Sequence, residues 1–289
     1  MQATEAPATQ AGTITIGGEN GFTVNRMAYG AMRITGDGIW GPPRDHDEAI
    51  RVLKRTLDLG INFIDTADSY GPHISEELIA EALHPYPEGL VIATKGGLLR
   101  TGPNQWPVDA SRKHLEEALD GSLKRLKLDQ IELYQLHRFD PKVPSEEFLG
   151  FLQEAQKAGK IKHIGLSEVG IEQIEEAKTY FDVVSVQNMY NFGQQKWNDV
   201  LKYCEQHNIA FIPWYPLNSG NISATEAIKK VAARHNATDY QIALAWLLAA
   251  SPVMLPIAGT SSVKHLEENV LAATIKLTDE DLQDMPLPK

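Results

Sequence analysis

Four polar side chains whose types suit acid-base chemistry stand where short apolar segments of the chain end. They are Asp65, Tyr70, Lys95 and His137, which supply a carboxylate, a phenol, an amine and an imidazole. Reduction of a carbonyl by hydride transfer leaves negative charge on the oxygen, so the site needs a proton donor within hydrogen-bond reach. A free tyrosine titrates near ~10, and a nearby ammonium group would favour its phenolate and make it a useful acid at neutral pH.

These residue types can divide the chemistry among them. Lys95 is the candidate ammonium beside the phenol of Tyr70, and Asp65 could hold and neutralise it. His137 would orient the substrate oxygen or assist proton delivery. Taken singly, each residue has an ordinary structural explanation, such as a turn cap, a solvated amine, a wall aromatic or a buried imidazole. Their joint placement at successive strand ends favours a shared catalytic site.

The elements that must position these residues alternate between short β-branched or aromatic runs and amphipathic segments. Such alternation predicts repeated strand-helix units with a parallel sheet. The expected strands cover residues 27–32, 61–65, 91–94, 131–136, 161–167, 183–187, 209–214 and 253–256. Eight units fit a closed barrel better than an open sheet. We therefore predict an α/β fold, a (β/α)8 TIM barrel whose chemistry lies at the carboxyl ends of the strands.

A short hairpin is predicted ahead of the first barrel strand. Residues 13–16 and 22–24 flank the turn sequence Gly-Gly-Glu-Asn-Gly, and the N-terminal β-hairpin could plug the barrel bottom. At 289 residues the chain exceeds the usual domain length, but barrels of this size form one domain, so residues 1–289 are expected to be a single domain. Residues 1–12 are expected to be a flexible N-terminal segment.

The composition argues against several classes of partner. Lys and Arg total 27 against 38 Asp and Glu, and the net charge of -11 disfavours nucleic acid or an anionic membrane as the general partner. The single cysteine, Cys204, cannot form an internal disulfide. Neither an export signal nor a membrane-spanning stretch is recognised, so a cytoplasmic protein, most simply a monomer, is expected. No His-x-His or equivalent spacing indicates a metal site.

The sequence Asn-Phe-Ile-Asp-Thr-Ala-Asp-Ser-Tyr-Gly at residues 62–71, joined by Thr94-Lys95 and Leu136-His137, resembles the aldo-keto reductase family. The resemblance extends from the N-terminal region to the C-terminus. It implies that Tyr70 is the general acid/base, that Lys95 and Asp65 form the supporting ion pair, and that His137 lines the carbonyl site. The implied activity is the NADPH-dependent reduction of aldehydes and ketones to alcohols.

The cofactor is expected to lie across the barrel top. No Gly-x-Gly-x-x-Gly follows a strand to open a helix, so a Rossmann dinucleotide site is not supported. The resemblance instead implies that Ser167, Glu168 and Gln187 fix the carboxamide and that Trp214 stacks on the nicotinamide ring. Without the resemblance, a strand-end hydrogen bond and a barrel-mouth aromatic explain Gln187 and Trp214 about as well. Further implied contacts are Met32, Arg33, Asp65, Tyr215, Pro216, Leu217, Asn218, Ser219 and Gly220.

Near the C-terminus a loop enters a predicted helix whose first amides suit a phosphate. The resemblance assigns the adenosine 2′-phosphate and the adenine to Gly259, Thr260, Ser261, His265, Glu268 and Asn269. Two positions depart from the family pattern, because Glu168 stands where many relatives have Asn and His265 stands near the Arg of NADPH-selective relatives. NADPH is the expected cofactor, and NADH is the alternative.

The expected substrate pocket is apolar, with walls from Trp40, Trp106 and Phe139. This set favours aromatic or medium-chain aldehydes over sugars. Arg138 could meet an acidic group or be a solvated loop arginine. Residues 70–74 and 81–86 are similar to pyridoxal reductase-like relatives, which makes pyridoxal a specific substrate hypothesis.

Two functions of other classes stay open. One is a non-catalytic NADPH-binding regulatory subunit, because potassium-channel β subunits share the expected fold. The other is a metal-dependent barrel hydrolase, which would need clustered His and Asp ligands at the strand ends.

Overall fold

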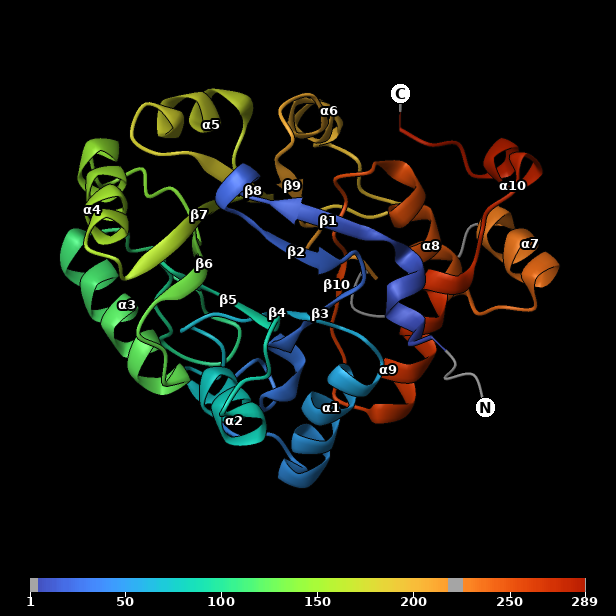
Figure 1. Cartoon of the computed structure of the whole chain (residues 1–289), viewed down its shortest axis with the longest axis horizontal. Coiled ribbons are helices and arrows are strands. Elements are labelled where there is room, and N and C mark those ends of the chain that lie inside the picture. Colours follow the sequence, from blue (N-terminus) through green and yellow to red (C-terminus); the bar gives the residue numbers. More distant parts are fainter. Residues whose placement is uncertain (1–4, 218–225, 289) are drawn as a thin grey trace.

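Short parallel strands surround a common axis, and helices cover them on the outside (Figure 1). The computed structural model describes residues 5–217 and 226–288. Within these ranges, the eight-stranded sheet consists of β3 (Ala28–Gly30), β4 (Phe63–Asp65), β5 (Val91–Gly96), β6 (Ile131–Leu136), β7 (Ile161–Ser167), β8 (Val183–Gln187), β9 (Ala210–Phe211) and β10 (Ile257–Ala258).

Several helices begin where a side chain satisfies one of the first amides. At the start of α1, Asp45 accepts a hydrogen bond from the Glu48 amide at 2.8 Å, and Thr238 and Gln241 form a reciprocal capping box at the start of α8. The helices are α1 (His46–Asp58), α2 (Ile74–Leu83), α3 (Arg112–Leu126), α4 (Ser145–Lys157), α5 (Ile171–Lys178), α6 (Asn198–Gln206), α7 (Glu226–His235), α8 (Asp239–Ala250), α9 (Val263–Val270) and α10 (Asp279–Asp284).

The ring of strands closes between β9 and the chain just before β10. Met254 forms a parallel bridge with Phe211 of β9. The Phe211 amide donates to the Val253 carbonyl at 2.9 Å, and the Leu255 amide donates back to the Phe211 carbonyl at 2.9 Å. At the other end of the sheet order, β10 pairs with β3. The predicted (β/α)8 barrel is therefore confirmed.

The eighth expected strand, at residues 253–256, is wrong in its extent. The chain contacts β9 before Pro256 and contacts β3 after it, through β10. Pro256 has no amide hydrogen, so it joins the ladder only through its carbonyl, which accepts from the Ala28 amide at 3.0 Å. The strand expected at residues 209–214 is likewise shorter, because β9 ends ahead of Pro213.

The two-residue period of the strands sets what faces the barrel interior. Phe63, Ala93 and Leu133 belong to one buried apolar cluster inside the barrel. Two positions further along the same strands stand Asp65, Lys95 and Gln135, all buried. The strand geometry therefore places the layer of Asp65, Lys95 and Gln135 directly above the apolar side chains of the barrel interior.

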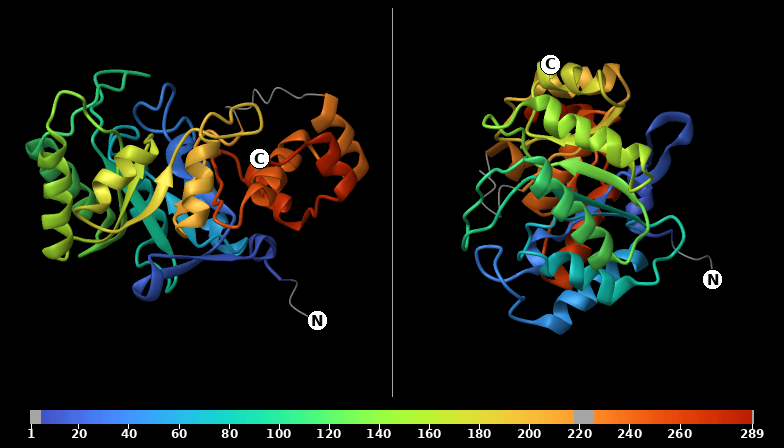
Figure 2. Two further views of the ribbon diagram at one scale, coloured as in Figure 1. Left: turned by 90° about the horizontal axis from the view of Figure 1, so that it is seen from above. Right: turned by 90° about the vertical axis from the view of Figure 1, so that its left-hand side faces the viewer.

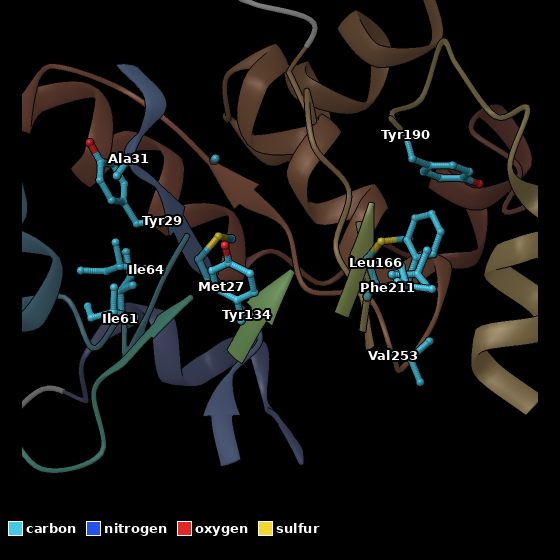
Figure 3. Packing of buried hydrophobic residues seen from close by; sticks show 14 of the residues in the cluster. Met27, Tyr29, Ala31, Ile61, Ile64, Tyr134, Leu166, Tyr190, Phe211 and Val253 are labelled. Carbon is cyan, nitrogen blue, oxygen red and sulfur yellow. The ribbon is translucent and has the colours of Figure 1, made fainter. Parts of the chain in front are cut away.

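The alternate residues of these strands face the helices. Tyr29 and Ile64 are register partners on β3 and β4, and both belong to the main core cluster together with Leu166 and Phe211. Figure 3 shows these side chains packed between the strands and the outer helices. Burial on both strand faces explains the nearly continuous apolar runs in the sequence.

The predicted hairpin is present and forms the bottom of the barrel. Strands β1 (Thr13–Ile16) and β2 (Phe22–Asn25) pair antiparallel, joined by the 3-10 turn η2 (Gly18–Asn20). Ile16 and Val24 are fully buried in the cluster that fills the barrel interior. In the left view of Figure 2 the hairpin lies along the lower side of the molecule.

The chain ahead of the hairpin contacts the barrel. Pro7–Ala11 forms the 3-10 helix η1, in which Ala8 is buried and donates its amide to the Leu59 carbonyl at 3.0 Å. Two further 3-10 segments, η3 (Ala31–Ile34) and η5 (Leu271–Thr274), follow β3 and α9. Across residues 5–217 and 226–288, we find no helix with the length and apolar character needed to cross a membrane.

We predict that Ile16→Ala lowers the free energy of unfolding by about 2–4 kcal/mol, because it removes a fully buried side chain from the barrel floor. Urea denaturation followed by circular dichroism measures the change. Thr15→Ala, an exposed position on the same strand, is the matched control. A loss for Ile16→Ala no larger than that for Thr15→Ala would contradict a stabilising role for the buried Ile16 side chain.

Candidate active site

Three of the predicted catalytic side chains meet at the top of the barrel interior. Lys95, at the end of β5, is fully buried, and its Nζ donates to Asp65 Oδ1 at 2.6 Å, to the Thr66 carbonyl at 2.8 Å and to Tyr70 Oη at 3.2 Å. These three acceptors match the three hydrogens of an ammonium group. Because Tyr70 Oη accepts from Lys95, the hydrogen of Tyr70 remains available to another acceptor.

The second oxygen of Asp65 is held by two glutamines. Gln187 Nε2 donates to Asp65 Oδ2 at 2.8 Å, and Gln135 Nε2 donates to it at 3.0 Å. Gln135 was not predicted, although a polar residue on the inward face of an apolar strand is the signal that could have identified it. Gly165, its register partner on β7, leaves the necessary space, since a Cβ there would lie 3.0 Å from Gln135 Cγ.

Burial and neighbouring charges shift the pKa values of both Lys95 and Tyr70. Burial opposes the charge on Lys95, but the nearby Asp65 carboxylate, assisted by Tyr70, outweighs it and raises the pKa of Lys95. Burial raises the pKa of the Tyr70 phenol, while the Lys95 ammonium acts in the opposite direction. Tyr70 is therefore protonated at neutral pH, and Lys95 is placed to stabilise the phenolate that forms when the proton leaves.

His137 lies beside Tyr70, with ring centroids 6.0 Å apart in an edge-on arrangement. Burial, together with the charges of Lys95 and Arg138, lowers the pKa of His137 well below its ordinary value. Its Nδ1 is buried and has no hydrogen-bond partner among the residues the structure describes. A neutral imidazole offers one donor and one acceptor, so His137 can orient a carbonyl oxygen.

A cavity of about 970 Å³ opens above these side chains, a size suited to a small-molecule ligand. Its wall includes three of the four predicted catalytic residues, Asp65, Tyr70 and His137, and also residues near the C-terminus. The predicted site residues on this wall are Met32, Arg33, Asp65, Tyr70, Trp106, His137, Ser167, Gln187, Trp214, Tyr215, Pro216, Leu217, Gly259, Thr260, Ser261, His265, Glu268 and Asn269.

Two predicted pocket residues are not brought to the cavity wall. Phe139 turns toward the core and packs edge-on against Phe148 of α4, with ring centroids 5.0 Å apart. Trp40 is 37% exposed and its backbone bridges Gly71. Besides the predicted Trp106, the apolar wall includes three residues that the sequence did not indicate, Ile39, Leu98 and Val108. The predicted contacts Asn218, Ser219 and Gly220 lie outside the described residues.

Glu168 lies behind the cavity wall and holds Trp214. Its Oε1 accepts from Trp214 Nε1 at 2.7 Å and from the Met189 amide at 2.5 Å. The carboxylate thus fixes the indole ring that lines the cavity. Glu168 was expected to contact the cofactor carboxamide, but its side chain holds Trp214 and is not part of the cavity wall.

The amide at the start of α9 already has an anionic partner. Glu48 of α1 accepts from the Val263 amide at 2.9 Å. The neighbouring loop presents Thr260, Ser261 and His265 to the cavity. A phosphate at this loop would therefore be met by these side chains and not by the Val263 amide.

Arg100, which no sequence motif marks, ties together the loops around Tyr70. Its guanidinium plane lies over the Trp106 ring, with Cζ 3.7 Å from the ring centroid. Its nitrogens donate to the backbone carbonyls of Gly38, Ile39, Ser69, Gly102 and Gln105. These carbonyls belong to the loop after β3, the segment beside Tyr70 and the loop after β5, so one side chain sets the apolar side of the cavity.

A second buried polar cluster joins β5 to the helices α2 and α3. Glu76 of α2 accepts from Thr94 Oγ1 at 2.5 Å and from Arg125 Nε at 2.7 Å. Asp68 is buried nearby, and its Oδ1 lacks a partner among the described residues. Burial, with repulsion from Glu76, raises the pKa of Asp68 to about 8. In the described ranges, no group of three or more His, Cys, Asp or Glu residues is arranged to hold a metal ion.

A (β/α)8 barrel with a lysine, an aspartate and a tyrosine joined under a deep cavity has the architecture of a barrel oxidoreductase. Residues 26–286 match the model of the Aldo/keto reductase family. The chain belongs to this family, which confirms the predicted resemblance and identifies the protein as an oxidoreductase.

Individual relatives agree with this assignment. The chain is 54% identical over 274 residues to an uncharacterized oxidoreductase of Schizosaccharomyces pombe, which covers 94% of this chain and 88% of the relative. It is 40% identical over 279 residues to pyridoxine 4-dehydrogenase of Escherichia coli, covering 94% and 96%. A solved thermostable aldo-keto reductase in complex with the inhibitor epalrestat is 30% identical, with a TM-score of 0.82 over 94% of this chain and 97% of that one.

We predict that Arg100→Lys loosens the two cavity loops without unfolding the barrel. Lysine lacks the planar fork and loses several of the carbonyl contacts, each contributing about 1 kcal/mol. Hydrogen exchange in residues 36–43 and 98–107 should become at least about tenfold faster. Mass spectrometry of peptic peptides measures the rates, with Arg112→Lys as the control. Unchanged exchange in both loops would contradict the role of Arg100.

We predict that Asp68→Asn stabilises the protein at alkaline pH and not in acid. The folded protein holds the pKa of Asp68 at about 8 instead of the ordinary 3.8, so the stability of the native chain falls as the pH rises through this window. The variant lacks this loss, and its Tm should exceed that of the native protein by about 3 °C or more at pH 8, with little difference near pH 4. Scanning calorimetry measures both. Asp129→Asn, at an exposed position, is the control, and a similar gain at both pH values would refute the explanation.

Proposed function

We propose that the protein reduces aldehydes or ketones to alcohols with NADPH, and that Tyr70 is the proton donor. The observation that carries the proposal is the triple hydrogen bond of Lys95 to Asp65, Thr66 and Tyr70. It keeps an ammonium beside the phenol while the phenolic hydrogen stays free. Membership of the aldo/keto reductase family supports the reaction class.

The residues on the cavity wall fit a nicotinamide cofactor. NADP(H) is the cofactor of the aldo/keto reductase family. The wall offers the indole plane of Trp214, the amide of Gln187 and the hydroxyl of Ser167 on one side. It offers the hydroxyls of Thr260 and Ser261 on the other. The aromatic face suits the nicotinamide ring, and the hydroxyl groups suit the carboxamide and the phosphates as donors. Gln187 Nε2 is already bound to Asp65 and Gln135, so Gln187 would accept from the carboxamide through its side-chain carbonyl. When bound, NADPH supplies a hydride to the carbonyl carbon.

The protein residues handle the proton and the charge. Tyr70 donates its proton to the carbonyl oxygen as negative charge develops there. Lys95 stabilises the phenolate left behind, and Asp65 keeps the ammonium in place. Neutral His137 donates a hydrogen bond that orients the same oxygen. In the reverse direction the phenolate of Tyr70 would accept the proton from the alcohol.

Pyridoxal is the specific substrate we propose to test first. The relative from Escherichia coli is a pyridoxine 4-dehydrogenase at 40% identity over nearly the whole chain. Trp106, Ile39 and Leu98 give the cavity an apolar side that suits an aromatic ring. A regulatory NADPH-binding subunit is the competing function, and it predicts cofactor binding without turnover.

We predict that Tyr70→Phe lowers kcat by about 100-fold or more, because general acid catalysis contributes about 10²–10⁴. The binding of NADPH should change by less than about twofold, since the substitution removes only the phenolic oxygen. NADPH oxidation is measured at 340 nm against an aldehyde panel that includes pyridoxal, with NADH in parallel.

Tyr180→Phe, away from the cavity, is the matched control and should keep the native rate. Full activity of the Tyr70→Phe variant would remove Tyr70 from the mechanism. Tight binding of NADPH with no turnover of any carbonyl by the native protein would favour the regulatory function.

A further inference from the structure

Arg138 places a half-buried positive charge on the wall of the cavity. It follows His137 at the end of β6. Its Nη1 donates to the His137 carbonyl at 2.6 Å and to Ser167 Oγ at 3.0 Å. These two bonds hold the guanidinium in one orientation, with Cζ 5.8 Å from the centroid of the Trp214 ring. Arg138 is therefore a fixed part of the wall and not a solvated loop residue.

No carboxylate among the described residues forms an ion pair with Arg138. Glu168 attracts it, but Oε1 of Glu168 is bound by Trp214 and Met189. Neither Nε nor Nη2 of Arg138 has a hydrogen-bond partner in the described part of the chain. Burial lowers the pKa of Arg138, and the attraction of Glu168 acts in the opposite direction. A half-buried guanidinium with free donors is suited to a carboxylate or a phenolate.

The position of Arg138 relates it to the carbonyl site. Arg138 follows His137 in the chain, donates to its carbonyl and lines the same cavity as Tyr70, so it lies close to the groups proposed to meet the carbonyl oxygen. The strand order is β10-β3-β4-β5-β6-β7-β8-β9, in which β6 stands four places from β10 in a ring of eight. Arg138 is thus on the opposite side of the barrel mouth from the loop after β10 with Thr260 and Ser261. An anion bound by Arg138 is therefore not one held by that loop.

We propose that Arg138 is a specificity-determining residue that selects aromatic aldehydes bearing an anionic oxygen substituent, a carboxylate or a phenolate. The inference rests on the proposed carbonyl reduction at the same cavity. The apolar side formed by Trp106, Ile39 and Leu98 contacts the ring, and Arg138 contacts the anionic group. Pyridoxal, whose ring oxygen beside the aldehyde ionises readily, belongs to this chemical class.

The test compares substrates that differ only in charge. We would measure kcat/KM for 3- and 4-formylbenzoate and for the matching neutral formylbenzamides, with NADPH at pH 7. The native protein should prefer at least one formylbenzoate by about tenfold or more, because hydrogen bonds to charged groups contribute about 1.5–3 kcal/mol. Arg138→Gln should reduce this ratio to about one, and Arg138→Lys should restore part of it. Arg112→Gln removes an equal charge outside the cavity and should keep the native ratio.

The ratio is insensitive to partial misfolding, because both substrates use the same enzyme. A native protein without preference, or an Arg138→Gln variant with an unchanged ratio, would overturn the proposal. Weaker NADPH binding in that variant with an unchanged ratio would assign Arg138 to the cofactor and would also overturn it.

A binding measurement distinguishes failure of the proposed anion site from failure of the proposed carbonyl reduction. Calorimetry of the alcohol products, hydroxymethylbenzoate against hydroxymethylbenzamide, detects the anion site without turnover. If no aldehyde is reduced but the acid binds about tenfold tighter than the amide and Arg138→Gln removes the difference, the anion site stands and the proposed reaction falls. If reduction proceeds with no charge preference, the reaction stands and the anion site falls.

Discussion

The ammonium group of Lys95 is buried completely, and the arrangement of the site follows from the need to compensate its charge. An unpaired charge in a protein interior is very unfavourable, and removing one member of a buried pair costs about 3–5 kcal/mol. Asp65 supplies the opposite charge, and the Thr66 carbonyl and Tyr70 Oη accept the remaining hydrogens. The two glutamines that bind Asp65 leave its carboxylate without a buried unpaired oxygen. Structural compensation and the proposed catalysis thus use the same contacts.

The barrel makes this arrangement possible through the two-residue period of its strands. The layer that holds Asp65, Lys95 and Gln135 rests on the apolar side chains of the barrel interior, which the N-terminal hairpin seals from below. Water is excluded from that side, so the attraction between the ammonium and a nascent phenolate is stronger than it would be in solvent. The loops tied by Arg100 cover the apolar side of the cavity, and Arg138 and Trp214 form another side. Tyr70 and His137 line the cavity between these walls, where we propose that the carbonyl group lies.

Sequence reasoning found the residues whose positions depend on local pattern. Asp65 and Lys95 each stand at the end of an apolar strand, and the carboxyl ends of the strands in a β/α barrel are where active sites lie. Features set by distant packing were missed. Gln135 reaches Asp65 only because Gly165 on a neighbouring strand leaves room, and Phe139 turns away from the cavity because Phe148 of α4 packs against it. The contacts of Arg100 are backbone carbonyls of separate loops, which no side-chain pattern reports. The last strand begins later than expected because Pro256 has no amide hydrogen. The chain pairs with β9 before Pro256 and with β3 after it.

The most direct test of the central claim, that Lys95 acts through Tyr70, is a double-mutant cycle on the single-turnover rate of NADPH oxidation. The rates of the native protein, Tyr70→Phe, Lys95→Met and the double variant would be followed by the loss of NADPH fluorescence with saturating aldehyde. If Lys95 serves to stabilise the phenolate of Tyr70, its substitution should slow the native protein strongly and the Tyr70→Phe background by less than about threefold, because residues that act as a unit are not additive. Losses that multiply in the double variant would show that the two residues act independently and would contradict the account.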